Sequence, residues 1–434
     1  MSSKTVYVGM SADVFHHGHV NIIKEARKYG DVIIGLLNDK AVAEHKRLPY
    51  LSWQNRKEII ENIKGVSKVF EQQEWDYAPT ILKYKPDYMI HGSDWIEGPL
   101  APYRTLAIEA LKSYGGKLIE IEYTKGVSST HLSLKEKIIG TTTDLRKSSL
   151  KRLLNVKKIV RIMEAHNPLS ALILENISIN KNDKLIQFDG FWSSSLTDST
   201  SQGKPDIEVL EINNRLNNIN NIFDVTTKPL IMDADTGGKV EHFQLNVKSM
   251  ERLGISAVII EDKKGLKKNS LFGNEVKQEQ EDVKVFSEKI KAGRSSRISE
   301  HFMVIARVES LILEKGVKDA LSRADAYIEA GVDGIMIHSR QKTTDEIFQF
   351  SKEFRKKHKS IPLVSVPSTY NKVTEDELIE NGFNLVIYAN QMLRAAYPAM
   401  YNTARSILEN GRSFEADKDL IKIKDILELI PGTK

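Results

Sequence analysis

The sequence predicts an α/β protein in which a doubly wound parallel sheet is followed by a (β/α)8 barrel. Three observations support this prediction. Short apolar runs alternate with amphipathic stretches along most of the 434-residue chain, a length that suits two domains. The alternation stops at residues 135–155, which are rich in Lys, Thr and Ser. Eight strand candidates follow this interruption, which is the number that closes an α/β barrel.

The first domain is expected over residues 1–134. Its strands are predicted at residues 5–10, 32–37, 66–70, 88–91 and 117–121, and its first helices at 19–29 and 53–63. Strands that are joined through helices pair in parallel. Residues 135–155 are interpreted as a linker and leading helix, and residues 156–434 as the second domain.

The second domain contains the elements of the predicted barrel. Its eight strands are expected at residues 171–175, 186–188, 230–232, 257–260, 303–306, 334–337, 363–364 and 385–387. Helices are expected between most of them, at residues 206–218, 240–253, 275–291, 317–330, 345–357 and 375–381. The size of this domain fits a (β/α)8 barrel.

Composition excludes several kinds of chemistry. The chain has no cysteine, so disulfides, cysteine-ligated zinc, iron–sulfur clusters and thiol nucleophiles are excluded. A net charge of +5 over 434 residues is too dilute for a nucleic-acid-binding surface. No apolar run approaches the roughly 20 residues of a membrane-spanning helix, and the first residues do not resemble a signal peptide. We therefore expect a cytoplasmic protein whose partners are neither nucleic acid nor membrane.

Polar side chains follow most of the predicted barrel strands. The residues expected at these strand ends are Asp189, Asp233, Asp235, Glu261, Asp262, Arg307, Glu309, His338, Ser339 and Asn390. Because active sites of such barrels lie at the carboxyl ends of the strands, we expect these side chains at one mouth. Neighbouring carboxylates repel one another unless they share a hard divalent cation. The sequence therefore predicts a Mg²⁺ or Mn²⁺ site.

An HxGH motif follows the first predicted strand, at His16, Gly18 and His19. The glycine lets the backbone approach a phosphate, and the start of the next helix supplies N–H groups and a positive dipole. The two imidazoles can stabilise the charge that develops as pyrophosphate leaves. A solvated turn with incidental histidines is the alternative interpretation.

This N-terminal pattern resembles the HxGH nucleotidyltransferases, and among them the cytidylyltransferases that act on small phosphorylated or phosphonylated alcohols. Residues 53–56 resemble the family's (W/Y)xxR segment, residues 92–95 its GxDW-type turn, and residues 126–130 its GxSST signature. The resemblance implies CTP as co-substrate and catalytic roles for His16 and His19. It implies a nucleotide-binding set of Gly9, Asp13, Gly18, Lys46, Arg56, Ser128, Ser129 and Thr130.

Six fragments of the second domain combine carboxylates with hydroxyl, amide and basic side chains, at residues 164–167, 191–196, 232–237, 260–263, 267–271 and 306–309. Carboxylates suit a metal, whereas the other groups suit phosphate and carboxylate oxygens, so a phosphorylated oxoacid is implied. In order and spacing, these fragments resemble the phosphoenolpyruvate mutase/isocitrate lyase superfamily, and within it phosphoenolpyruvate mutase.

The resemblance implies a role for each fragment. Asp233 would reach Mg²⁺ directly. Three further carboxylates would be held to the ion through waters, namely Asp235, Glu261 and Asp206. Arg307 and His338 would bind the phosphoryl end of the substrate. The substrate pocket would be lined by Trp192, Ser194, Ser195 and Leu196.

Residues 262–273 resemble the family's gating loop, which closes over the substrate. Of the four lysines in this segment, only Lys267 is assigned to the site, and Lys263, Lys264 and Lys268 are expected on a solvated face. The predicted catalytic set of the barrel is Asp206, Lys267, Asn269, Arg307 and His338.

The reaction that the resemblance implies moves the phosphoryl group of phosphoenolpyruvate from the enol oxygen to C3, which gives phosphonopyruvate. Charge stabilisation and exclusion of water are both needed. Asn269 stands where the related phosphonopyruvate hydrolase has Thr, which favours the mutase over the hydrolase alternative. The superfamily's lyases use a cysteine on this loop, and the chain has none.

Together the two resemblances match bifunctional enzymes of phosphonate biosynthesis. The N-terminal domain would then activate a phosphonate intermediate such as 2-hydroxyethylphosphonate. Met10 and Tyr123 depart from the family pattern, so a non-catalytic nucleotide-binding domain is the alternative. The resemblance also implies a phosphonopyruvate decarboxylase as pathway partner. Because barrels of the superfamily commonly exchange their last helix, we expect residues 391–410 to pack on a neighbour in a tetramer.

Overall fold

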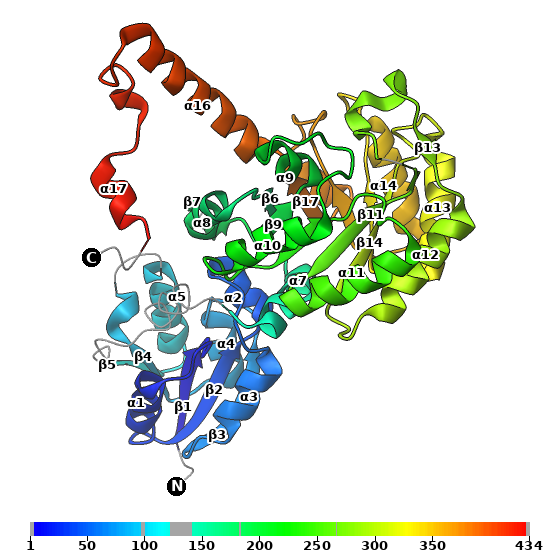
Figure 1. Cartoon of the computed structure of the whole chain (residues 1–434). Helices are drawn as coiled ribbons and strands as arrows, with labels where there is room; N and C mark the ends of the chain where they lie inside the picture. Colours follow the sequence, from blue (N-terminus) through cyan, green and yellow to red (C-terminus); the bar gives the residue numbers. More distant parts are fainter. Residues whose placement is uncertain (1–3, 97–99, 122–140, 182–183, 266, 431–434) are drawn as a thin grey trace. The chain divides into compact units, whose positions relative to one another are not determined.

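The computed structural model describes residues 4–96, 100–121, 141–181, 184–265 and 267–430 (Figure 1). The chain divides into two compact units. One consists of Met1–Glu136 with Ser178–Ile186, and the other of Lys137–Ile177 with Gln187–Lys434. The first contains a five-stranded parallel sheet and the second a closed barrel of eight parallel strands, so the predicted fold class is confirmed.

The N-terminal sheet has the strand order β3-β2-β1-β4-β5. Its strands are β1 (Thr5–Met10), β2 (Asp31–Leu37), β3 (Val66–Gln72), β4 (Tyr88–Gly92) and β5 (Lys117–Ile121). Its helices are α1 (His17–Ala26), α2 (Asp39–His45), α3 (Trp53–Glu61), α4 (Ala78–Tyr84) and α5 (Ala101–Lys112). The chain order reverses between β1 and β4, and ligands of such open sheets bind at the carboxyl ends of the strands at this reversal.

The barrel strands follow one another around a closed ring. They are β6 (Val160–Glu164), β9 (Gly190–Ser193), β10 (Leu230–Asp233), β11 (Ala257–Glu261), β14 (Met303–Val308), β15 (Gly334–Ile337), β16 (Leu363–Ser365) and β17 (Leu385–Tyr388). The helices of this unit are α7 (Thr143–Val156), α8 (Pro168–Asn176), α9 (Ser195–Ser201), α10 (Ile212–Phe223), α11 (Val240–Leu253), α12 (Val283–Ser296), α13 (Gly316–Ala330), α14 (Asp345–Lys357), α15 (Glu375–Glu380), α16 (Gln391–Asn410) and α17 (Ile423–Glu428).

The first two barrel strands are not where the sequence placed them. Residues 171–175 lie in α8, because Asn167 caps this helix in a capping box with Ser170 and Pro168 occupies its first turn. A short apolar run does not by itself distinguish a buried helix from a strand. Residues 186–188 likewise do not form a barrel strand, since β8 (Lys184–Gln187) pairs with β7 (Ser178–Lys181) in a separate two-stranded sheet.

Two predicted helices begin later than expected. Residues 206–211 precede α10, and residues 275–282 precede α12 and include β13 (Glu279–Gln280). This short strand pairs with β12 (Lys263–Lys264), so the start of the predicted gating segment is held to residues that follow that segment. None of the helices within the described ranges combines the length and apolar character needed to cross a bilayer.

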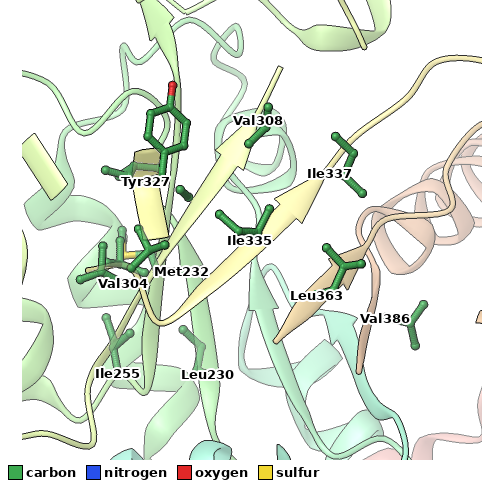
Figure 2. Packing of buried hydrophobic residues seen from close by; sticks show 14 of the residues in the cluster. Leu230, Met232, Ile255, Val304, Val308, Tyr327, Ile335, Ile337, Leu363 and Val386 are labelled. Atoms are coloured by element: carbon green, nitrogen blue, oxygen red, sulfur yellow. The ribbon is translucent and has the colours of Figure 1, made fainter. Parts of the chain in front are cut away.

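Alternation along the barrel strands determines which residues face the helices. Met232, Ile260, Val308 and Ile337 belong to the hydrophobic cluster that the strands form with the surrounding helices (Figure 2). Successive side chains of a strand point to opposite faces. The intervening residues and those next in line therefore point into the barrel, and they include Trp192, Asp233, Glu261, Arg307 and His338.

Candidate functional site

The turn between β1 and α1 carries the predicted phosphate-binding histidines. His16 caps the helix, and its Nδ1 accepts a hydrogen bond from the Gly18 N–H at 3.1 Å. In return, the His19 Nδ1 accepts one from the His16 N–H at 3.3 Å, and the two ring centroids lie 4.1 Å apart. The structure thus brings these three residues together at a helix N-terminus, where N–H groups and the helix dipole favour an anion.

The capping bonds also fix the chemistry of the two rings. Because each Nδ1 accepts a backbone N–H, each neutral imidazole carries its proton on Nε2. Burial, and next the proximity of His17, lowers the pKa of His16. Burial, followed by the nearby His16 and Lys46, lowers the pKa of His19 to about 3. Both rings are therefore neutral N–H donors near pH 7.

Two other residues of the predicted nucleotide site make ion pairs within the unit. Asp13 is buried and lies 2.7 Å from the Arg47 guanidinium. Arg56 is also buried, donates to the Ser11 carbonyl and pairs with Asp39 at 2.7 Å. These contacts hold the β1–α1 turn to α2 and α3, so the assignment of Arg56 to substrate binding stays a prediction.

The remaining predicted nucleotide-binding residues have varied positions. A Cβ at Gly9 would lie 2.3 Å from the Tyr77 ring, so this position requires glycine for close packing. Lys46 follows α2, and its ammonium lies 5.2 Å from the centroid of the Trp75 ring. The predicted GxSST signature, with Ser128, Ser129 and Thr130, lies outside the described residues.

A cavity of about 60 Å³ lies inside the barrel at the carboxyl ends of the strands. Every residue predicted for the barrel site lines it, except Asp235 and Glu261. This volume is below the roughly 300–1,000 Å³ of typical ligand pockets, so a substrate requires some of the cavity walls to move apart. The lining residues that the sequence did not single out include Met336, Val366, Ser368 and Ala389. A larger cavity of about 400 Å³ lies between α7 and α11 and contains none of the predicted residues.

Asp233 ends β10 with both carboxylate oxygens engaged. Oδ1 accepts the Asp235 N–H at 3.0 Å, and Oδ2 accepts the Ser195 hydroxyl at 3.0 Å. The Lys267 ammonium hydrogen-bonds Ser195 and Asp235, and lies 3.1 Å from Asp206 and 3.8 Å from Asp233. Burial alone would raise the pKa of Asp233, but neighbouring positive charges, Lys267 first, lower it to about 2. Asp233 is therefore ionised at neutral pH.

Glu261 is a buried carboxylate that lacks hydrogen bonds. Neither carboxylate oxygen has a hydrogen-bond partner, although Arg307 lies 3.3 Å and Lys263 3.6 Å away. Burial, only partly offset by these cations, raises the pKa of Glu261 to about 7. A buried carboxylate without hydrogen bonds is costly and indicates a missing partner.

The oxygen donors of this region fit a hard divalent cation. Asp233 and Glu261 lie at neighbouring strand ends, and Asp206 and Asp235 converge on the Lys267 ammonium. Within the described parts of the chain, no three side chains surround one point as metal ligands would. Instead Lys267 supplies the positive charge among these carboxylates. Carboxylates without a soft ligand are the donor type that suits Mg²⁺ or Mn²⁺.

Arg307 and His338 form the positive side of the cavity. The Arg307 Nη2 donates to the His338 Nδ1 at 3.0 Å and to the Ser270 hydroxyl, while its Nε donates to Glu309. An arginine can only donate, so neutral His338 carries its proton on Nε2. Burial, and next the charge of Arg307, lowers the pKa of His338. The pair offers a cation and a neutral N–H donor to an anion.

The prediction that Lys263 lies on a solvated face is wrong. Its side chain is 3% exposed, and its ammonium donates to the Lys268 carbonyl at 2.9 Å and to the Ser270 hydroxyl at 2.6 Å.

The prediction that Asp189 ends a barrel strand is also wrong. Asp189 precedes β9 and pairs with Lys157 at 2.5 Å. The misplaced second strand caused this error.

Arg215 is a buried residue that sequence reasoning missed. It donates to Asp198 at 2.9 Å, to the Asp233 carbonyl at 2.5 Å and to the Ser193 carbonyl at 3.2 Å. It thereby ties the ends of β9 and β10 together beneath the site. The sequence contained a signal for this burial, because Arg215 lies four residues before Ile219 and therefore on the apolar stripe of α10.

Comparisons with known proteins agree with this geometry. A phosphoenolpyruvate phosphomutase family model matches residues 150–408, and a cytidylyltransferase-like model matches residues 7–133. A phosphoenolpyruvate phosphomutase of Tetrahymena pyriformis is 35% identical over 283 residues, covering 65% of this chain and 90% of that protein.

Solved structures match the barrel as well. The crystal structure of a phosphoenolpyruvate phosphomutase from Streptomyces platensis subsp. rosaceus matches 65% of this chain and 94% of that chain, at 34% identity and a TM-score of 0.60. A phosphonopyruvate hydrolase in complex with oxalate and Mg²⁺ matches the same shares at 35% identity and a TM-score of 0.58. The chain therefore belongs to the phosphoenolpyruvate phosphomutase family and carries a cytidylyltransferase-like domain before its barrel.

Proposed function

We propose that the barrel interconverts phosphoenolpyruvate and phosphonopyruvate, and that the N-terminal unit transfers a cytidylyl group from CTP to a phosphonate. One observation carries the first part. The carboxylate cluster around Asp233 and the Arg307–His338 pair face one cavity, with Asn269 on its wall. With its walls moved apart, such a cavity would hold the two ends of a phosphorylated oxoacid at once.

The phosphoryl end would lie at the positive side of the cavity. The Arg307 guanidinium can neutralise phosphoryl oxygens, and the His338 Nε2–H can donate to a third oxygen. Loose phosphoryl transfer spreads charge over these oxygens, so fixed donors aimed at them lower the barrier. Glu309 keeps Arg307 in place by accepting a hydrogen bond from the Arg307 Nε.

The oxoacid end would lie at the carboxylate side. Asp233 would hold the divalent cation, with Asp235, Glu261 and Asp206 around it. A bound Mg²⁺ or Mn²⁺ supplies charge neutralisation for the carboxylate and enol oxygens of the substrate. The Ser194 hydroxyl and the backbone N–H groups of Ser194 and Ser195 would bind the substrate carboxylate. Trp192 and Leu196 would confine the pyruvyl group while C3 turns toward phosphorus.

Asn269 favours rearrangement over hydrolysis. Its Nδ2 donates to Asp206 at 2.9 Å, so its amide lies beside Lys267 on the cavity wall. The alternative activity, phosphonopyruvate hydrolysis, would need water to enter the cavity and reach phosphorus, and Lys267 and Asn269 on the cavity wall would hinder that entry.

Phosphorus NMR of the full chain with phosphonopyruvate and Mg²⁺ tests the barrel proposal. We expect the phosphoenolpyruvate signal to grow, because the reaction is an isomerisation. Inorganic phosphate as the only product would reject the mutase and support the hydrolase. The Asp233→Asn variant provides the matched blank.

The N-terminal proposal rests on the His16–Gly18–His19 turn at the reversal of strand order. Two neutral Nε2–H donors and the helix N–H groups would bind the triphosphate, and Lys46 would add positive charge. Pyrophosphate release from CTP with 2-hydroxyethylphosphonate or 2-aminoethylphosphonate tests the activity. CTP binding without pyrophosphate release from any phosphonate would support the alternative, a nucleotide-binding domain without catalysis.

We also propose that α16 packs on a second copy of the chain in a tetramer. None of its residues is buried, and Tyr397 and Leu408 are 68% and 84% exposed. Light scattering at micromolar concentration tests the assembly, and a monomer would reject it. A phosphonopyruvate decarboxylase, which removes the product, is the proposed pathway partner.

A further inference from the structure

One lysine, one serine and one glutamate connect the segment 267–270 to the barrel wall. Lys263 lies in β12, where it pairs with Gln280 of β13. Its ammonium donates to the Lys268 carbonyl at 2.9 Å and to the Ser270 hydroxyl at 2.6 Å, and it forms an ion pair with the Glu309 carboxylate at 3.1 Å. These contacts use two of the three ammonium protons in hydrogen bonds and place a carboxylate against the charge.

The Ser270 hydroxyl uses its full capacity for hydrogen bonds. Its hydroxyl donates to Glu309 at 2.6 Å and accepts from Lys263 and from Arg307. A hydroxyl offers one proton and two lone pairs, and all are used. Glu309 itself is fully buried, and the surrounding cations outweigh its burial and keep its pKa well below the usual range. Lys263, Ser270 and Glu309 are called the clasp below.

The clasp restrains the residues next to its attachment points. With the Lys268 carbonyl and the Ser270 hydroxyl both held, Asn269 between them and Lys267 directly before them have little freedom. Their side chains then reach Asp206 at 3.1 Å and 2.9 Å. The clasp also holds Arg307 through Ser270 and Glu309, so one group of bonds sets both the cavity wall and the phosphoryl-binding side.

We propose that Lys263 and Ser270 are positioning residues whose clasp with Glu309 keeps Lys267 and Asn269 over the cavity, and thereby decides whether the phosphoryl group reaches carbon or oxygen of the substrate or is lost to water. This inference rests on the proposed mutase function. Loss to water breaks the bond between phosphorus and C3 and forms one between phosphorus and the water oxygen. A proton ends on C3, and the products are pyruvate and inorganic phosphate.

Two variants open the clasp, and two matched variants control for them. Lys263→Met removes the ammonium, whereas Lys264→Met makes the same change at the exposed neighbouring lysine. Ser270→Ala removes the hydroxyl, whereas Ser270→Thr keeps it. Ser270→Ala leaves no buried charge unpaired, so it serves if Lys263→Met does not fold.

The first measurement is limited trypsin digestion of the full-length protein without substrate, followed by mass spectrometry of cuts after Lys267 and Lys268. Removing a hydrogen bond to a charged group shifts a local equilibrium by about tenfold or more. We expect Lys263→Met and Ser270→Ala to be cut about tenfold faster, and Lys264→Met and Ser270→Thr to be cut at the wild-type rate. Equal rates for all five proteins would overturn the clasp.

The second measurement is the share of phosphonopyruvate converted to inorganic phosphate instead of phosphoenolpyruvate, followed by phosphorus NMR. This share is a ratio and does not depend on the fraction of folded enzyme. We expect the share converted to inorganic phosphate to rise in Lys263→Met and Ser270→Ala, and to have the wild-type value in Ser270→Thr. Faster proteolysis with an unchanged share would overturn the role in product partition. If the wild type makes no phosphoenolpyruvate at all, the proposed function fails, while the trypsin result still decides on the clasp.

Discussion

The histidine turn of the N-terminal unit and the barrel mouth both lie at the carboxyl ends of parallel strands, but they hold their side chains by different means. His16 and His19 are held by backbone bonds within one helical turn. Asp233, Lys267 and Arg307 also contact side chains from distant parts of the chain, namely Ser195, Asp206 and Ser270 in that order. Local capping suffices for neutral rings, whereas buried charges need partners from several strands.

This difference predicts how each site responds to change. A substitution in the histidine turn removes one donor and leaves its surroundings intact. A substitution in the barrel leaves a buried opposite charge without a partner, which costs more than the lost bond itself. The predictions below test this contrast.

The largest effect is expected for Asp233→Ala. It removes the proposed metal ligand and leaves Lys267 with fewer counter-charges, so rearrangement should fall by about 10³-fold. Steady-state kinetics and Mn²⁺ binding measured by electron paramagnetic resonance report the two consequences. Asp224→Asn, at an exposed carboxylate after α10, is the control and should retain both properties. An active Asp233→Ala would refute the assigned role.

Arg215→Met should destabilise the barrel by about 3 kcal/mol, because Asp198 becomes a buried carboxylate without its cation. Chemical denaturation measures the free energy of unfolding. The exposed Arg252→Met provides the comparison and should change it by less than about 0.5 kcal/mol. Equal stability of the two variants would mean that Arg215 does not hold the strand ends.

His19→Ala should reduce cytidylyl transfer by about 10²-fold, the scale for removing one fixed donor to a developing anion. Rearrangement in the barrel should be unchanged, since the contacts of His19 are local. His17→Ala alters the exposed residue of the same turn and should have little effect on either activity. A loss of barrel activity in His19→Ala would contradict the local character of the His19 contacts.

The smallest effect concerns pH. Because burial lowers the pKa of His19 to about 3, the ring should stay neutral as the pH falls from 8 to 5. Because the pKa of His19 is depressed in the folded protein, the ring is protonated only below that folded-state pKa. The Cε1–H resonance of His19, assigned by its loss in His19→Asn, should therefore not move over this range. A titration midpoint near 6.5 would show an exposed ring.

Prediction from sequence succeeded where a pattern repeats locally. Apolar runs at regular spacing located β10, β11, β14, β15, β16 and β17, and helices α11 and α14 have the predicted bounds. The first predicted strand failed because residues 171–174 are all apolar, and the Asn167–Pro168 cap is the signal that identifies them as helix. The second failed because its residues belong mainly to β8, which pairs with β7 outside the barrel. The strand ends gave Asp233, Arg307, His338 and Asn390 of the barrel cavity. The family resemblance supplied the others that were predicted, namely Trp192, Ser194, Ser195, Leu196, Asp206, Lys267 and Asn269.

Lys263 and Arg215 were not predicted, because their roles depend on partners far away in the chain. A lysine run has the composition of a solvated surface, and only the folded structure places Glu309 and Ser270 against Lys263. The position of Arg215 on the apolar stripe of α10 indicated burial, but its role required knowledge that β9 and β10 end side by side. Side-chain networks between strands are set by tertiary packing and leave little trace in local sequence.

The most direct test of the central claim is a crystal structure of the full chain with Mg²⁺ and oxalate. The account predicts a Mg²⁺ ion with an Asp233 oxygen about 2.1 Å away, Glu261 turned toward the ion's waters, and oxalate between the ion and the Ser194–Ser195 backbone. A structure in which oxalate binds while Asp233 has no ion beside it would contradict the account.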